Sequence, residues 1–128
     1  LFDELREALG PDDFGAVLIK RGERQVKWYR ARIDRSLSLE EQVQTLVEIR
    51  DQEGYMAEVQ EGPDGSFLLI ENHCPICSAA KSCSKLCSVE FDVFRRSIGE
   101  GVLVKRVEHI LEGSRRCVYQ FSPKQARA

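Results

Sequence analysis

The sequence lacks any long apolar run. No stretch approaches the roughly 18–20 continuous apolar residues that a membrane-spanning helix requires. It also lacks a basic segment followed by an apolar one, which is the pattern of a secretory leader. We therefore expect a cytoplasmic protein with no membrane partner. A basic excess is missing as well, because 19 basic and 21 acidic side chains give a net charge of −2. A freestanding nucleic-acid-binding protein usually carries such an excess, so we do not expect this chain to bind DNA by itself.

The sequence also has few signs of an enzyme. Its glycines occur in turn or helix-end contexts rather than in a phosphate-binding loop. Its two histidines have no neighbouring pattern of a nucleophilic triad. We therefore predict that the chain is not an enzyme. With 128 residues, 42% of them apolar and 31% charged, it has the composition of one folded domain. Because it begins at Leu1 inside a helical pattern, we interpret it as a fragment of a longer protein.

The first third of the chain has helical periodicity. Apolar residues recur every three to four positions over residues 1–9, and Gly10 and Pro11 end that pattern. A second, longer helix is predicted over residues 12–34. Basic residues outnumber acidic ones in its second half. This half is either an ordinary solvated helix face or a linker helix near DNA that another domain binds.

Strand patterns follow a third helix. Ser38 and Glu41 form a capping box that begins this helix, and Gly54 ends it. Apolar and polar residues then alternate over residues 55–60, and a turn rich in glycine separates them from a partner strand over residues 66–71. These features predict a β-hairpin.

A second hairpin follows one more helix. The helix is predicted over residues 86–98, and the strands over residues 102–109 and 115–122. Helices thus come first, followed by two hairpins that a helix separates. The predicted fold class is α+β, with a small antiparallel sheet and one long N-terminal helix.

Five cysteines are the most unusual feature of the composition. They are Cys74, Cys77, Cys83, Cys87 and Cys117. Their odd number and the expected reducing compartment favour free thiols over disulfides. If the two hairpins form one sheet, Cys117 on its strand can face the segment and the helix that carry the other four. The predicted site is a metal centre formed by these five thiols.

Three chemistries fit the spacing of the thiols. An iron–sulfur cluster accepts thiolates spaced widely along the chain. A structural zinc site needs four thiolates, but the chain has only one C-x₂-C pair, formed by Cys74 and Cys77. The same pair has the form of a thiol–disulfide redox motif. Unreactive buried thiols are the fourth alternative. Glu90, three residues after Cys87, is either an oxygen ligand, a group that supports the ligands, or a glutamate that complements a helix dipole.

The cysteine segment and the residues after it resemble a known family. The shared residues are Asn72-His73-Cys74-Pro75-Ile76-Cys77, Ala79-Ala80, Cys83, Leu86-Cys87, Glu90, Phe94, Val104, Arg106, Glu108-His109-Ile110, Gly113, Cys117 and Tyr119. In this pattern the chain resembles the C-terminal regulatory domain of bacterial winged-helix transcriptional regulators, and within them the repressors of iron–sulfur-cluster assembly genes. The resemblance covers most of the chain.

The resemblance implies a function and a set of ligands. Cys74, Cys87 and Cys117 correspond to cysteines that hold an iron–sulfur cluster, expected to be of the 4Fe–4S type. It further implies a homodimer that binds DNA through an N-terminal winged-helix domain outside this sequence. The expected organisation is a linker and dimerisation segment over residues 1–36, a regulatory domain over residues 37–123 and a tail over residues 124–128. A structural zinc-binding dimerisation module is the alternative.

Overall fold

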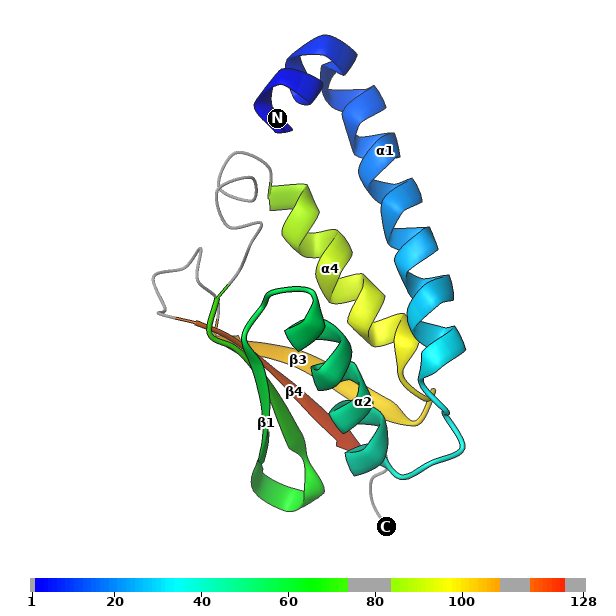
Figure 1. Ribbon diagram of the computed structural model, residues 1–128, viewed down its shortest axis with the longest axis vertical. Coiled ribbons are helices and arrows are strands. Elements are labelled where there is room, and N and C mark those ends of the chain that lie inside the picture. The colour runs from blue at the N-terminus through cyan, green and yellow to red at the C-terminus, as the bar shows by residue number, and fades with distance from the viewer. Residues whose placement is uncertain (1, 74–83, 109–115, 124–128) are drawn as a thin grey trace.

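A computed structural model shows the arrangement of the chain (Figure 1). The structure describes residues 2–73, 84–108 and 116–123. Its elements are α1 (Phe2–Arg32), α2 (Leu39–Gln52), β1 (Ala57–Glu61), η1 (Pro63–Gly65), β2 (Phe67–Glu71), α4 (Ser84–Ser97), β3 (Val102–Glu108) and β4 (Cys117–Pro123). The α+β class predicted from the sequence is therefore confirmed.

Helix α1 consists of two helical segments joined at a kink. Gly10 has φ 82° and ψ 160°, a conformation outside the helical region that a residue without a Cβ adopts at little cost. Pro11 follows it and lacks the backbone N–H that a continuous helix would use. The sequence prediction of two helices separated here is confirmed. Beyond the kink, one face of α1 is buried, including Leu18, Val26 and Tyr29.

Helix α2 begins at the predicted capping box. The Ser38 hydroxyl accepts a hydrogen bond from the Glu41 backbone N–H at 3.2 Å. The Glu41 carboxylate in turn accepts one from the Ser38 backbone N–H at 3.3 Å. Two N–H groups at the helix start are thereby satisfied. Behind this cap, Val43, Leu46 and Ile49 are fully buried against the sheet and the other helices.

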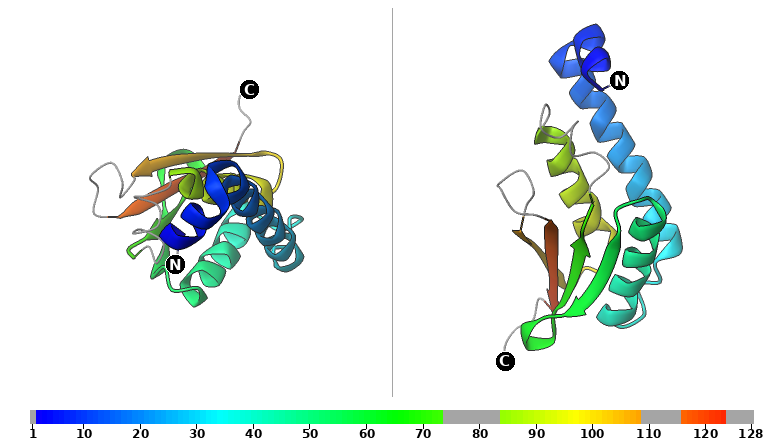
Figure 2. Two further views of the ribbon diagram at one scale, coloured as in Figure 1. Left: turned by 90° about the horizontal axis from the view of Figure 1, so that it is seen from above. Right: turned by 60° about the vertical axis from the view of Figure 1, so that its left-hand side comes forward.

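The four strands form one antiparallel sheet in the order β1-β2-β4-β3. The two hairpins therefore join through β2 and β4, in register from Phe67 opposite Phe121 to Glu71 opposite Cys117. Helices α1, α2 and α4 all lie on one side of this sheet (Figure 2). The first strand begins at Ala57 rather than at Tyr55, because Met56 has a positive φ of 47° that interrupts the extended backbone.

The hydrophobic core lies between the sheet and the helices. Tyr119 of β4 packs edge-on against Phe94 of α4, with ring centroids 4.8 Å apart. On the α1 side, a Cβ added at Gly22 would come within 2.5 Å of the Val89 side chain, so the two helices approach closely at this glycine. The second half of α1 is thus part of the packed domain. None of the described helices is long and apolar enough to cross a membrane.

Candidate metal centre and buried ion-pair network

Two of the five predicted ligands lie within the described residues. Cys87 is the fourth residue of α4 and is half-buried. Cys117 is the first residue of β4 and is 5% exposed. Neither forms a disulfide. Cys74, Cys77 and Cys83 lie outside the described residues.

Cys87 and Cys117 belong to the same layer of the domain. Side chains alternate along a strand, so Cys117 shares a face of the sheet with Tyr119. That face meets α4, because Tyr119 stacks on Phe91 at 6.3 Å between ring centroids. Phe91 is one helical turn beyond Cys87. The start of α4 and the start of β4 therefore lie at the same end of this layer.

The connection from β2 to α4 carries the remaining candidate ligands. The segment over residues 74–83 joins the end of β2 to the start of α4, and the segment over residues 109–115 joins β3 to β4. Within the described part of the chain, no three histidine, cysteine, aspartate or glutamate side chains lie close enough to hold a metal ion. A metal centre at this end would therefore need thiols from residues 74–83.

A buried ion-pair network lies beside this end of the sheet. Its centre is Arg50 of α2, which is 1% exposed. Arg50 Nε donates to the Glu71 carboxylate at 2.6 Å, and Arg50 Nη1 donates to the Glu90 carboxylate at 2.7 Å. Glu71 and Glu90 are 2% and 3% exposed. One guanidinium group thus joins the last residue of β2 to the second turn of α4.

Aromatic rings enclose the Arg50 side chain. Its Cζ lies 3.6 Å from the centroid of the Tyr55 ring and 4.6 Å from that of the Phe94 ring. The planar guanidinium is well suited to such stacking while its edges donate hydrogen bonds. The Tyr55 hydroxyl also donates to Glu90 at 3.4 Å. The charge at Arg50 is therefore held away from water by rings and carboxylates together.

Helix α1 joins the network through two side chains. The Tyr29 hydroxyl accepts from Arg50 Nη1 at 3.2 Å and donates to Glu53 at 2.6 Å. Arg21 donates to the second oxygen of Glu90 at 3.2 Å. The network therefore contacts α1, α2, β2 and α4.

Burial and charge act in opposite directions on the network. Desolvation raises the pKa of Glu90, but Arg50 and Arg21 outweigh it and hold that pKa below the usual value. Desolvation dominates at Glu71 and raises its pKa despite Arg50. At Arg50 the two carboxylates outweigh desolvation and hold the pKa well above the usual value. Arg50 therefore stays charged.

These contacts decide between the roles considered for Glu90. It lies in the second turn of α4, not at the helix start, so complementing the helix dipole is not its main role. Both of its carboxylate oxygens accept hydrogen bonds, from Arg50 and Arg21. Glu90 is therefore occupied in a structural ion pair and is not an available oxygen ligand.

Sequence reasoning missed Arg50, Glu71 and Tyr29. Spacing could have indicated Arg50, because it follows Val43 by seven positions on the buried face of α2. Glu71 likewise alternates with the buried Leu69 along β2. A charged residue at an apolar position of such a pattern indicates a buried ion pair, but the pattern does not identify its partner.

Comparison with protein-family models and with curated proteins gives no match.

Proposed function

We propose that this chain is the sensor domain of a transcriptional regulator, in which thiolates hold an iron–sulfur cluster or a metal ion. An attached winged-helix domain would bind DNA. The observation that carries the proposal is the placement of Cys87 and Cys117 at one end of the α4–sheet layer, beside a buried network that reaches α1. The resemblance of the cysteine pattern to winged-helix regulators supports the same function.

The donor chemistry at this end favours soft metals. Glu71 and Glu90, the buried carboxylates nearest in sequence to the cysteines, are both bonded to Arg50. Thiolates are the remaining donors of the predicted site, and they prefer zinc and iron–sulfur clusters. Cys74, Cys87 and Cys117 would hold the group, with Cys77 and Cys83 as further candidates. A bound cluster would supply a link among the thiolates that oxidation breaks.

The Arg50 ion-pair network would transmit the binding or loss of this group to α1. Glu71 lies three residues before Cys74, and Glu90 lies three residues after Cys87. Arg50 holds both carboxylates and also contacts Tyr29 of α1. A change in the positions of β2 and α4 would therefore alter the packing of α1. Because α1 would lead to the DNA-binding domain, two arrangements of α1 can correspond to two affinities for DNA.

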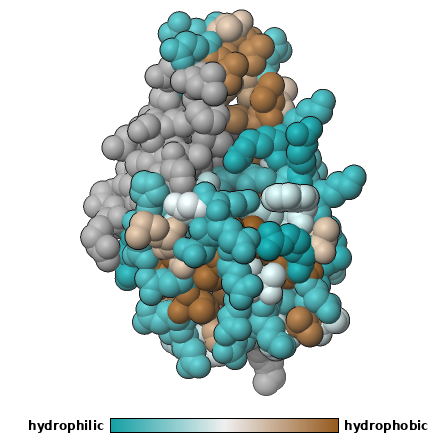
Figure 3. Space-filling model, viewed as in Figure 1, coloured by the Kyte–Doolittle hydropathy of each residue, from teal (hydrophilic) through white to brown (hydrophobic). Residues whose placement is uncertain are grey.

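The dimer proposed for this regulator would use α1. Large apolar side chains remain exposed on α1, among them Val17 at 48% and Trp28 at 61%. They are eleven positions apart, about three helical turns, and so lie on one face. Figure 3 shows apolar surface near the N-terminal end of α1, above a more hydrophilic body. A second copy of α1 would cover this face.

The decisive experiment measures iron, zinc and acid-labile sulfide per chain after purification without oxygen. Near-equal iron and sulfide, with a brown colour that air bleaches, would support the cluster. Cys87→Ser and Cys117→Ser should each abolish the colour. Cys77→Ser and Cys83→Ser are the matched variants, because the resemblance does not assign these two thiols as ligands. A wild-type protein without iron, sulfide or zinc after anaerobic reconstitution would contradict the proposal.

Zinc is the second candidate, because a set of thiolate donors also suits a structural zinc site. Stoichiometric zinc without sulfide, unchanged by exposure to air, would make the chain a zinc-binding dimerisation module. The search for a regulatory signal would then move away from the thiols.

A further inference from the structure

A cleft lies at the end of the domain away from Cys87 and Cys117, where α4 ends and β3 begins. It has a volume of about 580 Å³. The end of α1 and the segment after it form one wall, and the end of α4, the turn after it and β3 form the other. This volume falls within the range of roughly 300–1,000 Å³ that holds small-molecule ligands. Ile98, Val102 and Val104 supply apolar lining between the polar groups.

Arginine dominates the charge of the cleft. Arg30, Arg35, Arg95 and Arg96 line it, whereas Glu100 is the one carboxylate among its lining residues. This concentration of positive charge contrasts with the net charge of −2 of the whole chain. A local field of this kind attracts small anions.

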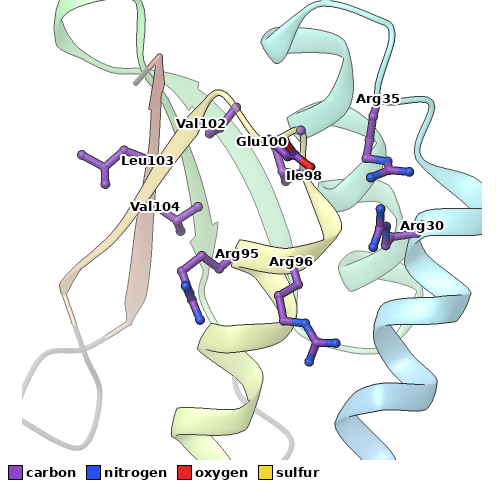
Figure 4. A pocket seen from close by; sticks show the side chains of 10 residues that line it. Arg30, Arg35, Arg95, Arg96, Ile98, Glu100, Val102, Leu103 and Val104 are labelled. Carbon is purple, nitrogen blue, oxygen red and sulfur yellow. The ribbon is translucent and has the colours of Figure 1, made fainter. Parts of the chain in front are cut away.

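The four arginines differ in their partners. Arg96 pairs with Glu23 at 2.7 Å, and Arg95 pairs with Asp92. The guanidinium groups of Arg30 and Arg35 form no ion pair or hydrogen bond with any residue that the structure describes. Figure 4 shows the guanidinium groups of Arg30 and Arg35 pointing into the same space, with Glu100 on the opposite wall. Two guanidinium groups from different segments are therefore available to a ligand.

A buried amide holds the two walls together. Gln42, which is 5% exposed, donates through Nε2 to the carbonyl oxygens of Leu37 at 2.8 Å and Arg35 at 3.3 Å. Its Oε1 accepts from the Gly99 backbone N–H at 3.0 Å. The backbone of Arg35 is thus fixed relative to the turn that follows α4. The spacing of the walls is built into the fold, which lowers the ordering cost of binding a ligand.

We propose that this cleft binds a small phosphate-bearing molecule through Arg30 and Arg35. A terminal phosphate has three acceptor oxygens and a charge of about −1.5 to −2 at neutral pH, so two guanidinium forks attract it more strongly than they attract a singly charged carboxylate. The convergence of two arginines therefore selects phosphate over carboxylate. The site lies apart from the thiols, so it stands whether or not the chain holds a metal.

Glu100 opposes this ligand. Its carboxylate lines the same cleft and repels a phosphate that Arg30 and Arg35 attract. Replacing it with glutamine removes the repulsion while keeping the size of the side chain. Glu100→Gln should therefore tighten binding, a gain that a merely disrupted fold would not give.

The test is calorimetric titration of the chain with pyrophosphate at fixed ionic strength, with ADP and citrate as comparison ligands. Losing charge-assisted hydrogen bonds costs about tenfold or more in affinity. Arg30→Gln combined with Arg35→Gln should therefore raise the Kd for pyrophosphate by about that factor. The matched control combines Arg24→Gln with Lys27→Gln, which removes the same charge from exposed α1 positions outside the cleft. Its Kd should stay close to that of the wild type.

Binding of ADP and pyrophosphate that is tightened by Glu100→Gln and weakened only by the cleft variant would support the proposal. No binding of pyrophosphate or ADP to the wild type would overturn it. Equal weakening in the control variant would overturn it as well, because a general charge effect would explain the result. Tighter binding of citrate than of pyrophosphate would exclude phosphate as the selected group. Displacement of pyrophosphate by a short DNA duplex with the same arginine dependence would make nucleic-acid backbone the occupant instead.

Discussion

Glu71 and Cys117 lie directly opposite each other in the antiparallel pair of β2 and β4. Both are buried, at 2% and 5% exposed. Directly opposite residues place their side chains on the same face of a sheet, with Cβ atoms about 4.5–5.5 Å apart. The Glu71 carboxylate accepts a hydrogen bond from Arg50 at 2.6 Å. A candidate metal ligand, Cys117, therefore lies directly across the sheet from a member of the ion-pair network. Any change at Cys117 therefore occurs next to the Glu71 carboxylate, which is buried away from water.

Removing Arg50 should strongly destabilise the chain. Arg50→Met leaves Glu71 and Glu90 buried without their shared cation, and breaking a buried pair in this way costs about 3–5 kcal/mol. Urea unfolding should report this loss of free energy. Arg24→Met on the exposed side of α1 is the control and should change stability little.

Neutralising the two carboxylates should recover part of that loss. Arg50→Met combined with Glu71→Gln and Glu90→Gln removes the uncompensated charge, so the triple variant should be more stable than Arg50→Met alone. A triple variant less stable than the single one would show that packing around Arg50, rather than charge, is what the fold requires.

The two carboxylates should give opposite pH dependences. Folding lowers the pKa of Glu90 below 4.5, so its contribution to stability is complete above that pH. The contribution is lost as the pH falls through the lowered pKa. The stability difference between wild type and Glu90→Gln should therefore shrink in acid. It is measured from urea midpoints between about pH 3 and about pH 7.

Glu71 has the reverse sign, because folding raises its pKa above 4.5. Its contribution is present below 4.5 and is lost as the pH rises through the raised pKa. The wild type should therefore lose stability relative to Glu71→Gln as the pH rises. If the stability of both variants relative to the wild type changed with pH in the same direction, the pKa values of the two carboxylates would not be shifted in opposite directions.

Trp28 should control the oligomeric state. It is 61% exposed on α1, where the proposed dimer would cover it. Trp28→Glu places a charge on that face, so sedimentation at several concentrations should show monomers where the wild type forms dimers. Met56→Glu is the matched control, because Met56 is also 61% exposed but precedes β1. A Trp28→Glu protein as dimeric as the wild type would place the interface elsewhere.

Local features of the fold could be predicted from the sequence because local contacts determine them. The capping box at Ser38, the kink at Gly10 and the α+β order depend on neighbouring residues, and the structure confirms them.

The ion-pair network could not be predicted in the same way. Arg50 is 21 positions from Glu71 and 40 from Glu90, so only the packed fold brings their charges together. Spacing can indicate that Arg50 and Glu71 lie on buried faces, but it does not identify the charges that they meet. The thiols could be proposed as a site from the sequence, because cysteine is rare and the spacing of the cysteines is informative. No equivalent signal indicates the partners of an arginine.

The coupling between the thiols and α1 should depend on the planar guanidinium group of Arg50. Arg50→Lys keeps the positive charge but replaces a planar group with several donors by a single ammonium, which cannot hold Glu71 and Glu90 in the same geometry. Hydrogen exchange of the α1 amides, measured with and without anaerobic reconstitution with iron and sulfide, tests this. Loading should slow exchange over residues 18–32 in the wild type.

In Arg50→Lys the iron content should stay the same while the slowing of α1 exchange is lost. Cys87→Ser should lose both, which separates failure to bind from failure to couple. Equal slowing in wild type and Arg50→Lys, at equal iron content, would mean that β2 and α4 act on α1 without Arg50. The other contacts between α1 and α4 would then be the remaining routes, namely the Arg21–Glu90 and Glu23–Arg96 ion pairs and the close approach of the helices at Gly22.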